Sequence, residues 1–374
     1  MKIGFVLDDG LDSTDGVQQY ISTLGNWYKT HEHEVHYLVG HTKRQDIDNV
    51  HSLSRTIRVK ANQNKVGTPL PVKNSLIKNL LKRENFDVLH VQMPYSPLLA
   101  GKIINNAPKR TAIVGTFHIL PSSKIEHIAT KALGVSLRKS LKRFDRIISV
   151  SEPAARFANQ TFGVDSMVIP NAVDVANFQK GKKIKRLAND KLTIVYLGRL
   201  VKRKGCSYLL DALGVLNEKN RLANVQILIL SKGPLEKKLK NQARKLGLDQ
   251  KVEFTGFVEE EEKPDYLASA DIAVFPSTGG ESFGIVLVEA MAAGAEVVIA
   301  GDNPGYRSVI GNASKQLVNP KNTQEFADLL NEFITNKSKR RNSKKVQAEL
   351  VKQFDVENVG NKLLNIYKDI LKNK

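Results

Sequence analysis

The apolar positions of this chain fall into two series of short runs, separated by stretches with helical periodicity. The runs are rich in Val, Ile and Leu and do not alternate strictly, which is typical of strands buried on both faces of a parallel sheet. The first series is Lys2–Leu7, Glu34–Val39, Asp87–Val91, Ala112–Phe117, Arg146–Val150 and Met167–Ile169. The second series is Leu192–Leu197, Val225–Leu230, Val252–Phe254, Ile272–Phe275 and Glu296–Ala300. Strands alternating with helices predict an α/β protein with two doubly wound, Rossmann-like domains.

A polar, basic stretch between the two series marks the expected domain boundary. Asn177–Lys191 has no apolar periodicity, so we interpret it as a linker. We therefore predict an N-terminal domain over residues 1–176 and a C-terminal domain over residues 177–355. Val356–Leu371 is predicted to be a final amphipathic helix with one buried stripe. The apolar positions of that stripe are Val359, Leu363, Ile366 and Ile370.

The charge of the chain favours a polyanionic partner. Lys and Arg number 57 and Asp and Glu 38, a net charge of +19. The run Asn49–Arg83 contains no acidic residue. Its basic residues are Arg55, Arg58, Lys60, Lys65, Lys73, Lys78, Lys82 and Arg83. This run suggests an anionic membrane surface as partner, although lysines on solvated faces are the alternative explanation.

The helix predicted within this run, Val72–Arg83, has two possible environments. Its apolar residues share one arc of about 140° on a helical wheel, with Lys78 and Lys82 opposite. They are Leu76, Ile77, Leu80 and Leu81. Such a helix either packs on the sheet or rests on anionic lipid.

Cysteine content and hydropathy indicate the compartment. A single cysteine, Cys206, excludes an intramolecular disulfide and suits a reducing cytoplasm. No apolar run approaches the roughly 18 residues that span a bilayer, and we expect no signal peptide.

Aromatic residues make up 6%, and none interleave with a basic stretch, which argues against a nucleic-acid-binding protein.

The segment Ser277–Gly294 combines a glycine pair, two glutamates and an apolar helix. We expect the helix over Ser282–Ala293, with unpaired first amides and a dipole that favour a diphosphate. Glu281 stands at its start, and Glu289 follows about 12 Å along the axis. One carboxylate can then accept sugar hydroxyls and the other ribose hydroxyls. The alternative is a glycine-capped helix with two solvated glutamates.

The segment Leu197–Gly205 follows a strand of the buried type. Ligands of doubly wound sheets bind at the carboxyl ends of strands, where this segment places Arg199 and Lys204. A guanidinium and an ammonium suit a leaving diphosphate. We expect the neighbouring Lys202 and Arg203 to be solvated. A basic surface loop is the alternative.

The first domain offers candidate contacts near two strand ends. Gly16 is predicted to open a helix, where its amides can approach a phosphate or sugar ring, and Gln18 on the first turn can bond an acceptor hydroxyl. His118 directly follows the strand Ala112–Phe117 and is expected to face the cleft. The alternatives are an ordinary helix start and a structural histidine.

The remaining histidines show no recognised metal-ligand spacing with carboxylates or with the cysteine. They stand at positions 31, 33, 36, 41, 51, 90 and 127. We therefore predict no structural metal.

Together these motifs resemble glycosyltransferase family 4, over almost the whole chain and in the family's order. The motifs are Gly16-Val17-Gln18, Thr116-Phe117-His118, Ile169–Asp174, Gly198-Arg199 with Lys204-Gly205, and Glu281–Glu289. Within the family the run GGESFGIVLVEAMAAG is most similar to phosphatidylinositol α-mannosyltransferase-like enzymes. Asp9 and Asp15 depart from the family pattern, which often has an aromatic and a glycine there, so the C-terminal half carries more of the resemblance.

The resemblance implies the GT-B fold, in which two Rossmann-like domains face each other and a last helix, here residues 356–374, crosses back to the first. It implies a donor site that includes the amides of Phe283, Gly284 and Ile285. The other implied donor contacts are Gly16, Arg199, Lys204, Glu281 and Glu289. Gln18 and His118 would contact the acceptor. The implied catalytic residues are His118, Arg199, Lys204 and Glu281.

The implied activity is a retaining transfer of α-mannose from GDP-mannose to a lipid-linked acceptor such as phosphatidylinositol. No permanently bound cofactor or metal is implied, and the partners are the nucleotide sugar and an anionic membrane surface, without nucleic acid. The expected location is the cytoplasm, peripherally at the inner face of the cell membrane. A UDP-sugar donor with a soluble or different glycolipid acceptor, and a non-catalytic lectin-like protein, are the alternatives.

Overall fold

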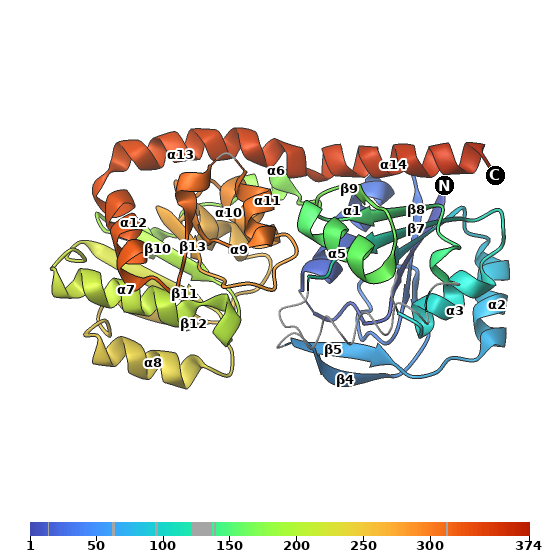
Figure 1. Ribbon diagram of the computed structural model, residues 1–374, viewed down its shortest axis with the longest axis horizontal. Coiled ribbons are helices and arrows are strands. Elements are labelled where there is room, and N and C mark those ends of the chain that lie inside the picture. The colour runs from blue at the N-terminus through green and yellow to red at the C-terminus, as the bar shows by residue number, and fades with distance from the viewer. Residues whose placement is uncertain (14, 62–63, 94–95, 121–136, 138–139, 312) are drawn as a thin grey trace. The chain divides into compact units, whose positions relative to one another are not determined.

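The computed structural model describes residues 1–374 except 14, 62–63, 94–95, 121–136, 138–139 and 312. The chain forms two compact units, each built on its own parallel sheet (Figure 1). The N-terminal unit comprises Met1–Ala172 and Val356–Lys374, and the C-terminal unit comprises Val173–Asp355. Among the described helices, none combines the length and hydropathy that a bilayer crossing requires.

The N-terminal unit is built on a seven-stranded parallel sheet of order β3-β2-β1-β6-β7-β8-β9. Its strands are β1 (Lys2–Leu7), β2 (Glu34–Val39), β3 (Val50–Ser52), β6 (Val88–Gln92), β7 (Ala112–Phe117), β8 (Arg146–Ser149) and β9 (Met167–Val168). Among the described residues, its helices are α1 (Gly16–Thr30), α2 (Asn74–Glu84), α3 (Leu99–Asn106), α5 (Glu152–Phe162) and α14 (Val356–Lys372).

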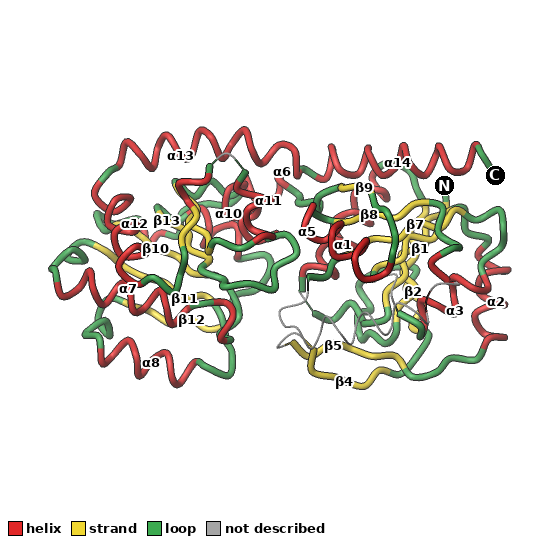
Figure 2. The backbone as a smooth tube through the Cα atoms, viewed as in Figure 1, coloured by secondary structure: helices red, strands yellow, loops and turns green. Residues whose placement is uncertain are grey.

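Helices cover both faces of this sheet, which explains why its strands are apolar without strict alternation. Along β1 (Figure 2), the side chains alternate between two cores: Phe5 and Leu7 belong to the core shared with α1 and α14, and Val6 belongs to the core shared with α2 and α3. Figure 2 shows the course of these elements. Ile77, Leu80 and Leu81 are the core residues of α2. This helix therefore packs on the sheet, one of the two environments that its sequence allowed.

The acid-free basic run also contains three short strands that its apolar pattern did not predict. Besides β3, it forms the antiparallel hairpin of β4 (Thr56–Ala61) and β5 (Asn64–Pro69). The hairpin is tied to the loop after β1, where Asp9 accepts a hydrogen bond from the Gly67 amide at 2.8 Å. A Cβ at Gly67 would lie 2.0 Å from Asp9 Oδ1, so this close approach requires glycine. Asp9, which departs from the family pattern, therefore fixes the β4–β5 hairpin to the loop after β1.

The C-terminal unit is built on a six-stranded parallel sheet of order β12-β11-β10-β13-β14-β15. Its strands are β10 (Leu192–Leu197), β11 (Val225–Leu230), β12 (Val252–Gly256), β13 (Ile272–Phe275), β14 (Val297–Gly301) and β15 (Leu317–Val318). Its main helices are α7 (Cys206–Glu218), α8 (Glu236–Lys245), α9 (Lys263–Ala268), α10 (Ile285–Ala292), α11 (Pro304–Ile310), α12 (Thr323–Thr335) and α13 (Lys337–Leu350). The strand order reverses between β10 and β13, the place where ligands of such sheets bind.

Three details of this unit differ from the sequence-based expectation, and one of them is the edge strand β15, which was not predicted. The expected linker Asn177–Lys191 contains the end of α6 (Val175–Gln179) and a 3₁₀ turn at Lys185–Leu187. The helix expected from Ser282 begins only at Ile285, because Gly284 adopts φ +133°, which lies outside the helical region. A Cβ at Gly284 would lie 2.6 Å from the Tyr306 ring, so its place requires glycine.

The final helix, α14, belongs to the first unit although it follows the second in sequence. It packs beside α1 through the buried residues Val359, Leu363 and Tyr367. Trp27 on α1 donates its indole N–H to Glu357 at 2.7 Å. The chain therefore crosses back to the first unit, as the resemblance implied.

The contact between α1 and α14 gives a direct test of this packing. A Cβ at Gly360 would lie 2.6 Å from the ring of Trp27, the only tryptophan of the chain. We expect Gly360→Val to lower the free energy of unfolding of the N-terminal unit by about 1–3 kcal/mol, because overpacking displaces the indole. Tryptophan fluorescence during urea denaturation measures the loss. Lys362→Val, an exposed position of the same helix, should stay within about 0.5 kcal/mol of the wild type. An equal loss in both variants would contradict the close packing.

Candidate active site

The loops after β10 and β13 lie against each other at the carboxyl ends of their strands. The Thr278 amide donates to the Arg203 carbonyl at 2.8 Å, and Ser277 Oγ donates to the same carbonyl at 3.1 Å. Gly205 makes the closest approach: a Cβ there would lie 1.9 Å from the Pro276 carbonyl oxygen, and its φ of +76° also favours glycine. The two loops therefore form one continuous site.

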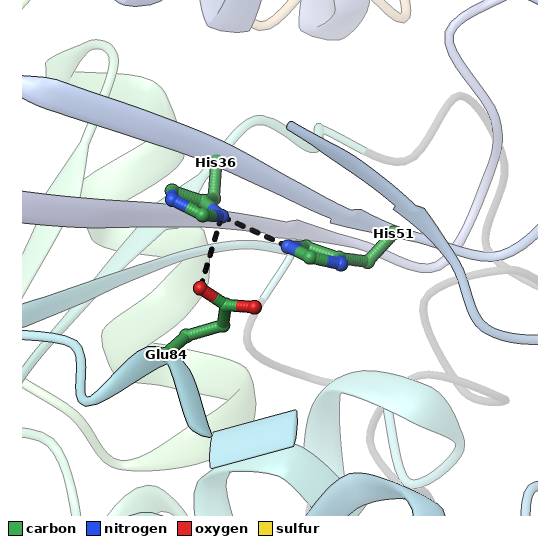
Figure 3. Close-up of side chains that lie close together, drawn as sticks. All are labelled: His36, His51 and Glu84. Atoms are coloured by element: carbon green, nitrogen blue, oxygen red, sulfur yellow. Dashed lines mark hydrogen bonds and ion pairs between the residues drawn. The ribbon is translucent and has the colours of Figure 1, made fainter. Parts of the chain in front are cut away.

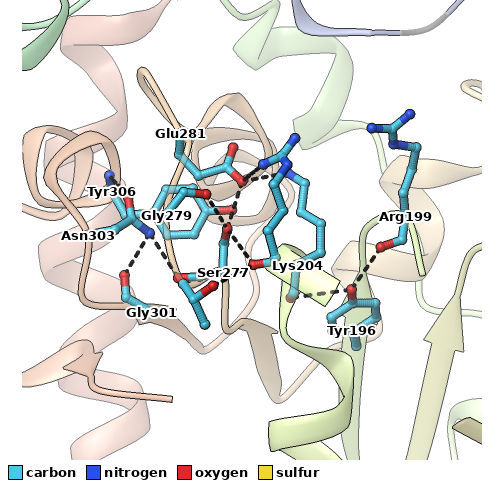
Figure 4. A network of polar contacts seen from close by, with 11 residues as sticks. Tyr196, Arg199, Lys204, Ser277, Gly279, Glu281, Gly301, Asn303 and Tyr306 are labelled. Carbon is cyan, nitrogen blue, oxygen red and sulfur yellow. Dashed lines mark hydrogen bonds and ion pairs between the residues drawn. The ribbon is translucent and has the colours of Figure 1, made fainter. Parts of the chain in front are cut away.

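A buried carboxylate lies at the centre of this site (Figure 4). One oxygen of Glu281, Oε1, accepts hydrogen bonds from Arg203 at 2.6 Å and Ser277 at 2.7 Å, and Lys204 Nζ lies 2.9 Å from it. The side chains of Glu281 and Arg203 are only 12% and 10% exposed. The second oxygen, Oε2, takes part in none of these three contacts. The expectation that Arg203 is solvated is therefore wrong, because its guanidinium turns inward to the glutamate.

The charges in this cluster control one another's protonation. Burial alone would raise the pKa of Glu281, but the positive charges of Lys204 and Arg203 hold it below its ordinary value. Burial lowers the pKa of Lys204, and the nearby carboxylate opposes that shift. The cluster consequently holds one ionised carboxylate and more than one positive charge, which suits a polyanionic ligand.

Buried polar groups hold the loop after β13 in place. Asn303 donates through Nδ2 to the carbonyls of Ser277 and Gly301, at 3.0 and 3.1 Å. Its side-chain oxygen accepts from the Tyr306 amide at 3.0 Å and so caps α11. One side chain therefore links the strand end, the loop and the next helix.

Arg199 stands beside the Glu281 cluster. Its carbonyl and that of Lys204 both accept from the hydroxyl of buried Tyr196 at 3.4 Å, which ties the ends of the loop together. Figure 4 shows the guanidinium of Arg199 apart from the carboxylate of Glu281. The two cations predicted from the motif, Arg199 and Lys204, thus occupy one loop but have different surroundings.

Glu289 lies deeper, within α10, and is buried. Burial raises its pKa, and the positive charge of Lys263 on α9 opposes that shift. Lys263 also forms an ion pair with Glu260 at 2.6 Å. Because α10 begins four residues after Glu281, the two glutamates are not separated by two helical turns as expected. Glu289 is a glutamate in an apolar interior, next to a lysine.

In the N-terminal unit, the candidate residues follow β1 and β7. Gly16 is the first residue of α1, as predicted. The preceding Asp15 has φ −70°, so this departure from the family pattern needs no left-handed backbone. Gln18 is buried, and its side-chain amide donates to the Gly10 carbonyl at 3.2 Å. Gln18, which was expected to bond an acceptor hydroxyl, therefore uses its side-chain nitrogen to hold the loop between β1 and α1.

His118 belongs to a short polar chain at the carboxyl ends of β6 and β7. Its Nε2 lies 2.7 Å from Gln92 Oε1, and Tyr20 packs edge-on to its ring at 4.9 Å. Burial lowers the pKa of His118 to about 3, so the ring is neutral at physiological pH. A neutral imidazole whose N–H points to an amide oxygen can bind a hydroxyl through Nδ1. Gln92 is a partner that the sequence analysis did not single out.

The C-terminal unit thus places an anion-binding charge cluster at the strand reversal of a doubly wound sheet, and the N-terminal unit repeats that sheet type. This combination is typical of proteins that bind phosphorylated nucleotides. A family model for glycosyl transferases group 1 matches residues 177–349, and one for Glycosyltransferase Family 4 matches residues 14–177. The chain belongs to glycosyltransferase family 4.

Named relatives are similar in sequence to almost the whole chain. A phosphatidyl-myo-inositol mannosyltransferase of Mycobacterium tuberculosis (strain ATCC 25618 / H37Rv) is 31% identical over 378 residues, covering 99% of this chain and 97% of the relative. A glycosyltransferase structure from Rickettsia africae matches at TM-score 0.76 and 19% identity, over 100% of this chain and 99% of its own. The Anabaena protein Alr3699/HepE in complex with UDP-glucose matches at TM-score 0.75 and 19% identity, over 99% and 100%. The two structures support the GT-B fold.

The charge cluster predicts strong coupling between Glu281 and Lys204. Glu281→Gln leaves buried cations without their carboxylate, and Lys204→Met removes a cation from it, so each variant should be less stable. We expect the double variant to recover part of the loss, with a coupling energy of about 1–3 kcal/mol. Chemical denaturation followed by circular dichroism measures all three variants. The exposed pair Glu236–Lys240 should couple by only about 0.5 kcal/mol. Additive losses at Glu281 and Lys204 would refute the coupling.

Proposed function

We propose that this chain is a retaining α-mannosyltransferase that transfers mannose from GDP-mannose to phosphatidylinositol or a related membrane lipid. The observation that carries the proposal is the 31% identity to phosphatidyl-myo-inositol mannosyltransferases over 99% of the chain. The charge cluster supports it, because its cations match the diphosphate of a nucleotide sugar.

Donor binding is assigned mainly to the C-terminal unit. Arg199 and Lys204 bind the diphosphate, and the amides of Phe283, Gly284 and Ile285 at the start of α10 add hydrogen bonds to the donor. In the absence of donor, Lys204 is paired with Glu281. When the diphosphate takes over that lysine, the carboxylate of Glu281 can accept hydroxyls of the mannose. Two further donor contacts are assigned to Glu289, with the ribose, and Gly16, with the phosphate.

The acceptor and the chemical step are assigned to fewer groups. His118 contacts the transferred mannose and positions the acceptor, with Gln18 beside the acceptor path. The leaving diphosphate takes the proton of the incoming hydroxyl on the face that it leaves, so the configuration at the anomeric carbon is retained. Arg199 and Lys204 stabilise the charge that develops on that diphosphate. The proposed reaction needs no permanently bound cofactor and no metal.

The lipid acceptor places the enzyme at the cytoplasmic face of the cell membrane. Large apolar side chains stand exposed in and beside β4, β5 and α2: Ile57 is 52%, Leu70 41% and Leu76 47% exposed. On α2, Lys78 and Lys82 are exposed too. Apolar and basic side chains together suit peripheral binding to anionic lipid.

A UDP-sugar donor is the second candidate. It is favoured by Alr3699/HepE, whose structure contains UDP-glucose and matches at TM-score 0.75. A diphosphate is common to both donors, so the cation cluster serves either equally well.

The donor and the acceptor class can be tested in one assay. We expect mannose from labelled GDP-mannose to enter the chloroform phase when the protein is incubated with membranes that contain phosphatidylinositol. Labelled UDP-glucose should leave the organic phase unlabelled. Glu281→Gln should lower the transfer rate about 100-fold or more, because the sugar loses a charged hydrogen-bond acceptor. Label from UDP-glucose in the organic phase, or in a water-soluble product separated from unreacted UDP-glucose, would favour the second candidate.

The glutamate variant needs a folding control, since Glu281 also neutralises buried cations. Circular dichroism and nucleotide binding of Glu281→Gln should be compared with those of Glu236→Gln, a partly exposed ion-pair position on α8. A folded, nucleotide-binding Glu281→Gln variant with full transfer would contradict the role assigned to Glu281.

Membrane binding has its own test. We expect Lys78→Glu with Lys82→Glu to weaken binding to vesicles of phosphatidylinositol and phosphatidylcholine by about 30-fold or more, since each basic residue near the surface contributes about 1 kcal/mol. Sedimentation of the full chain with vesicles measures this. The matched double change of Lys237 and Lys238, exposed on α8, should leave binding close to the wild type. If the two double variants weakened vesicle binding equally, the attraction to the vesicles would come from the overall charge of the protein and not from α2.

A further inference from the structure

Three potential metal ligands meet at the edge of the N-terminal sheet, outside every site described above (Figure 3). His36 lies on β2, His51 on the edge strand β3, and Glu84 is the last residue of α2. The parallel register pairs His51 with Leu38, two residues after His36, so both histidines lie on the face that α2 covers.

The ligand atoms of these residues converge. His36 Nδ1 lies 2.9 Å from His51 Nε2 and 4.0 Å from Glu84 Oε2, and all three ligand atoms lie within 4.8 Å of one another. Tetrahedral zinc with bonds of 2.0–2.1 Å separates its ligand atoms by about 3.3 Å. The His36–His51 distance of 2.9 Å is about 0.4 Å shorter than this separation, the His36–Glu84 distance of 4.0 Å is about 0.7 Å longer, and no distance exceeds 4.8 Å, so side-chain adjustments would give zinc geometry. Figure 3 shows the contacts of His51 and Glu84 meeting at the same nitrogen of His36.

The surrounding groups orient these ligands as in known metal sites. His36 Nε2 lies 2.8 Å from Glu34 Oε1. An ionised carboxylate only accepts, so Nε2 carries the proton and the neutral ring keeps a lone pair on Nδ1, toward His51. Glu84 is held through its other oxygen, Oε1, which accepts from Arg83 at 2.8 Å. Histidine held by a carboxylate through its other nitrogen is the usual arrangement around bound zinc.

Besides Arg83, which contacts Glu84 Oε1, the cation Lys2 contacts both carboxylates and lies on the Glu84 oxygen that would bind the metal. Its Nζ lies 2.9 Å from Glu34 and 3.3 Å from Glu84 Oε2. A metal on Glu84 Oε2 would replace the longer contact, and Lys2 would keep the shorter one with Glu34. The hydrogen bond between the two imidazoles would also be replaced, with the His51 proton carried on Nδ1.

We propose that His36, His51 and Glu84 bind one Zn²⁺ ion, with a fourth position open to water. Two imidazoles and a carboxylate are a ligand set that zinc prefers, and the partial exposure of His51 and Glu84 gives access. The ion would join β2, the edge strand β3 and the end of α2. The prediction of no structural metal overlooked this cluster, because its ligands come from three elements with sequence separations that match no metal motif.

Metal binding by the full chain tests the proposal without reference to sugar transfer. Chelator-treated protein is titrated with Zn²⁺ by calorimetry, and Co²⁺ serves as a spectroscopic probe of coordination. We expect one Zn²⁺ per chain, tetrahedral Co²⁺ absorption, and a higher midpoint of thermal unfolding with Zn²⁺. His51→Gln and Glu84→Gln should each weaken zinc binding about 100-fold or more, and Glu34→Gln about 10- to 100-fold.

His31→Gln is the matched control. His31 is an exposed histidine on another face of the unit, 3.9 Å from Glu357, and its loss should leave zinc affinity unchanged. Circular dichroism of each metal-free variant verifies its fold. The proposal is overturned if the wild type binds no zinc, or if His51→Gln and Glu84→Gln bind zinc as the wild type does. If His31→Gln were the one variant that lost zinc binding, the ion would belong to the pair of His31 and Glu357, and the proposal would also be overturned.

Discussion

The ion pairs of one buried carboxylate, Glu281, are the interaction on which the C-terminal site depends. Arg203 and Lys204 come from the loop after β10, whereas Glu281 comes from the loop after β13, so the contact joins the two loops at the sheet's point of strand reversal. Without the carboxylate, two cations would be buried side by side at a large electrostatic cost. The close approach at Gly205 and the hydrogen bonds of Asn303 make this geometry possible, because they bring the loop backbones into contact.

The same topology organises both units. In each sheet the first strand lies beside the fourth strand in sheet sequence, β1 beside β6 and β10 beside β13, which opens a place for ligands where the chain turns in opposite directions. In the N-terminal unit, Asp8 occupies the corresponding position directly after β1. Its carboxylate has a structural role there, because it accepts a hydrogen bond from the Ala100 amide at 2.8 Å. In the C-terminal unit the corresponding place holds cations. The charge of the strand ends therefore distinguishes the two units.

The sequence predicted the features that follow from local pattern, and missed those that depend on distant contacts. The buried strands were found, because runs such as Ile272–Phe275 are apolar on both faces. The strands β3, β4 and β5 were missed, because they lie in a polar, basic run with no apolar periodicity. Arg203 was misjudged for a related reason: nothing in the loop sequence distinguishes a cation that turns toward Glu281 from one that turns to water. The helix start at Ile285 was missed because it depends on the non-helical backbone of Gly284, and only the distant Tyr306 ring shows why glycine is required there.

The charge balance of the site also limits where donor specificity can arise. Arg203 and Lys204 outnumber Glu281, and Arg199 adds a third cation beside them, so the site favours a ligand with several negative charges. A diphosphate meets that demand whether it carries guanosine or uridine. Discrimination between the two donors must therefore come from residues that contact the base, and discrimination between sugars from hydrogen bonds to hydroxyls such as those proposed for Glu281. Under the proposed function, sugar recognition by Glu281 would be coupled to diphosphate binding, because the diphosphate would take Lys204 from the same carboxylate. A free hexose without a diphosphate should consequently gain little from this carboxylate.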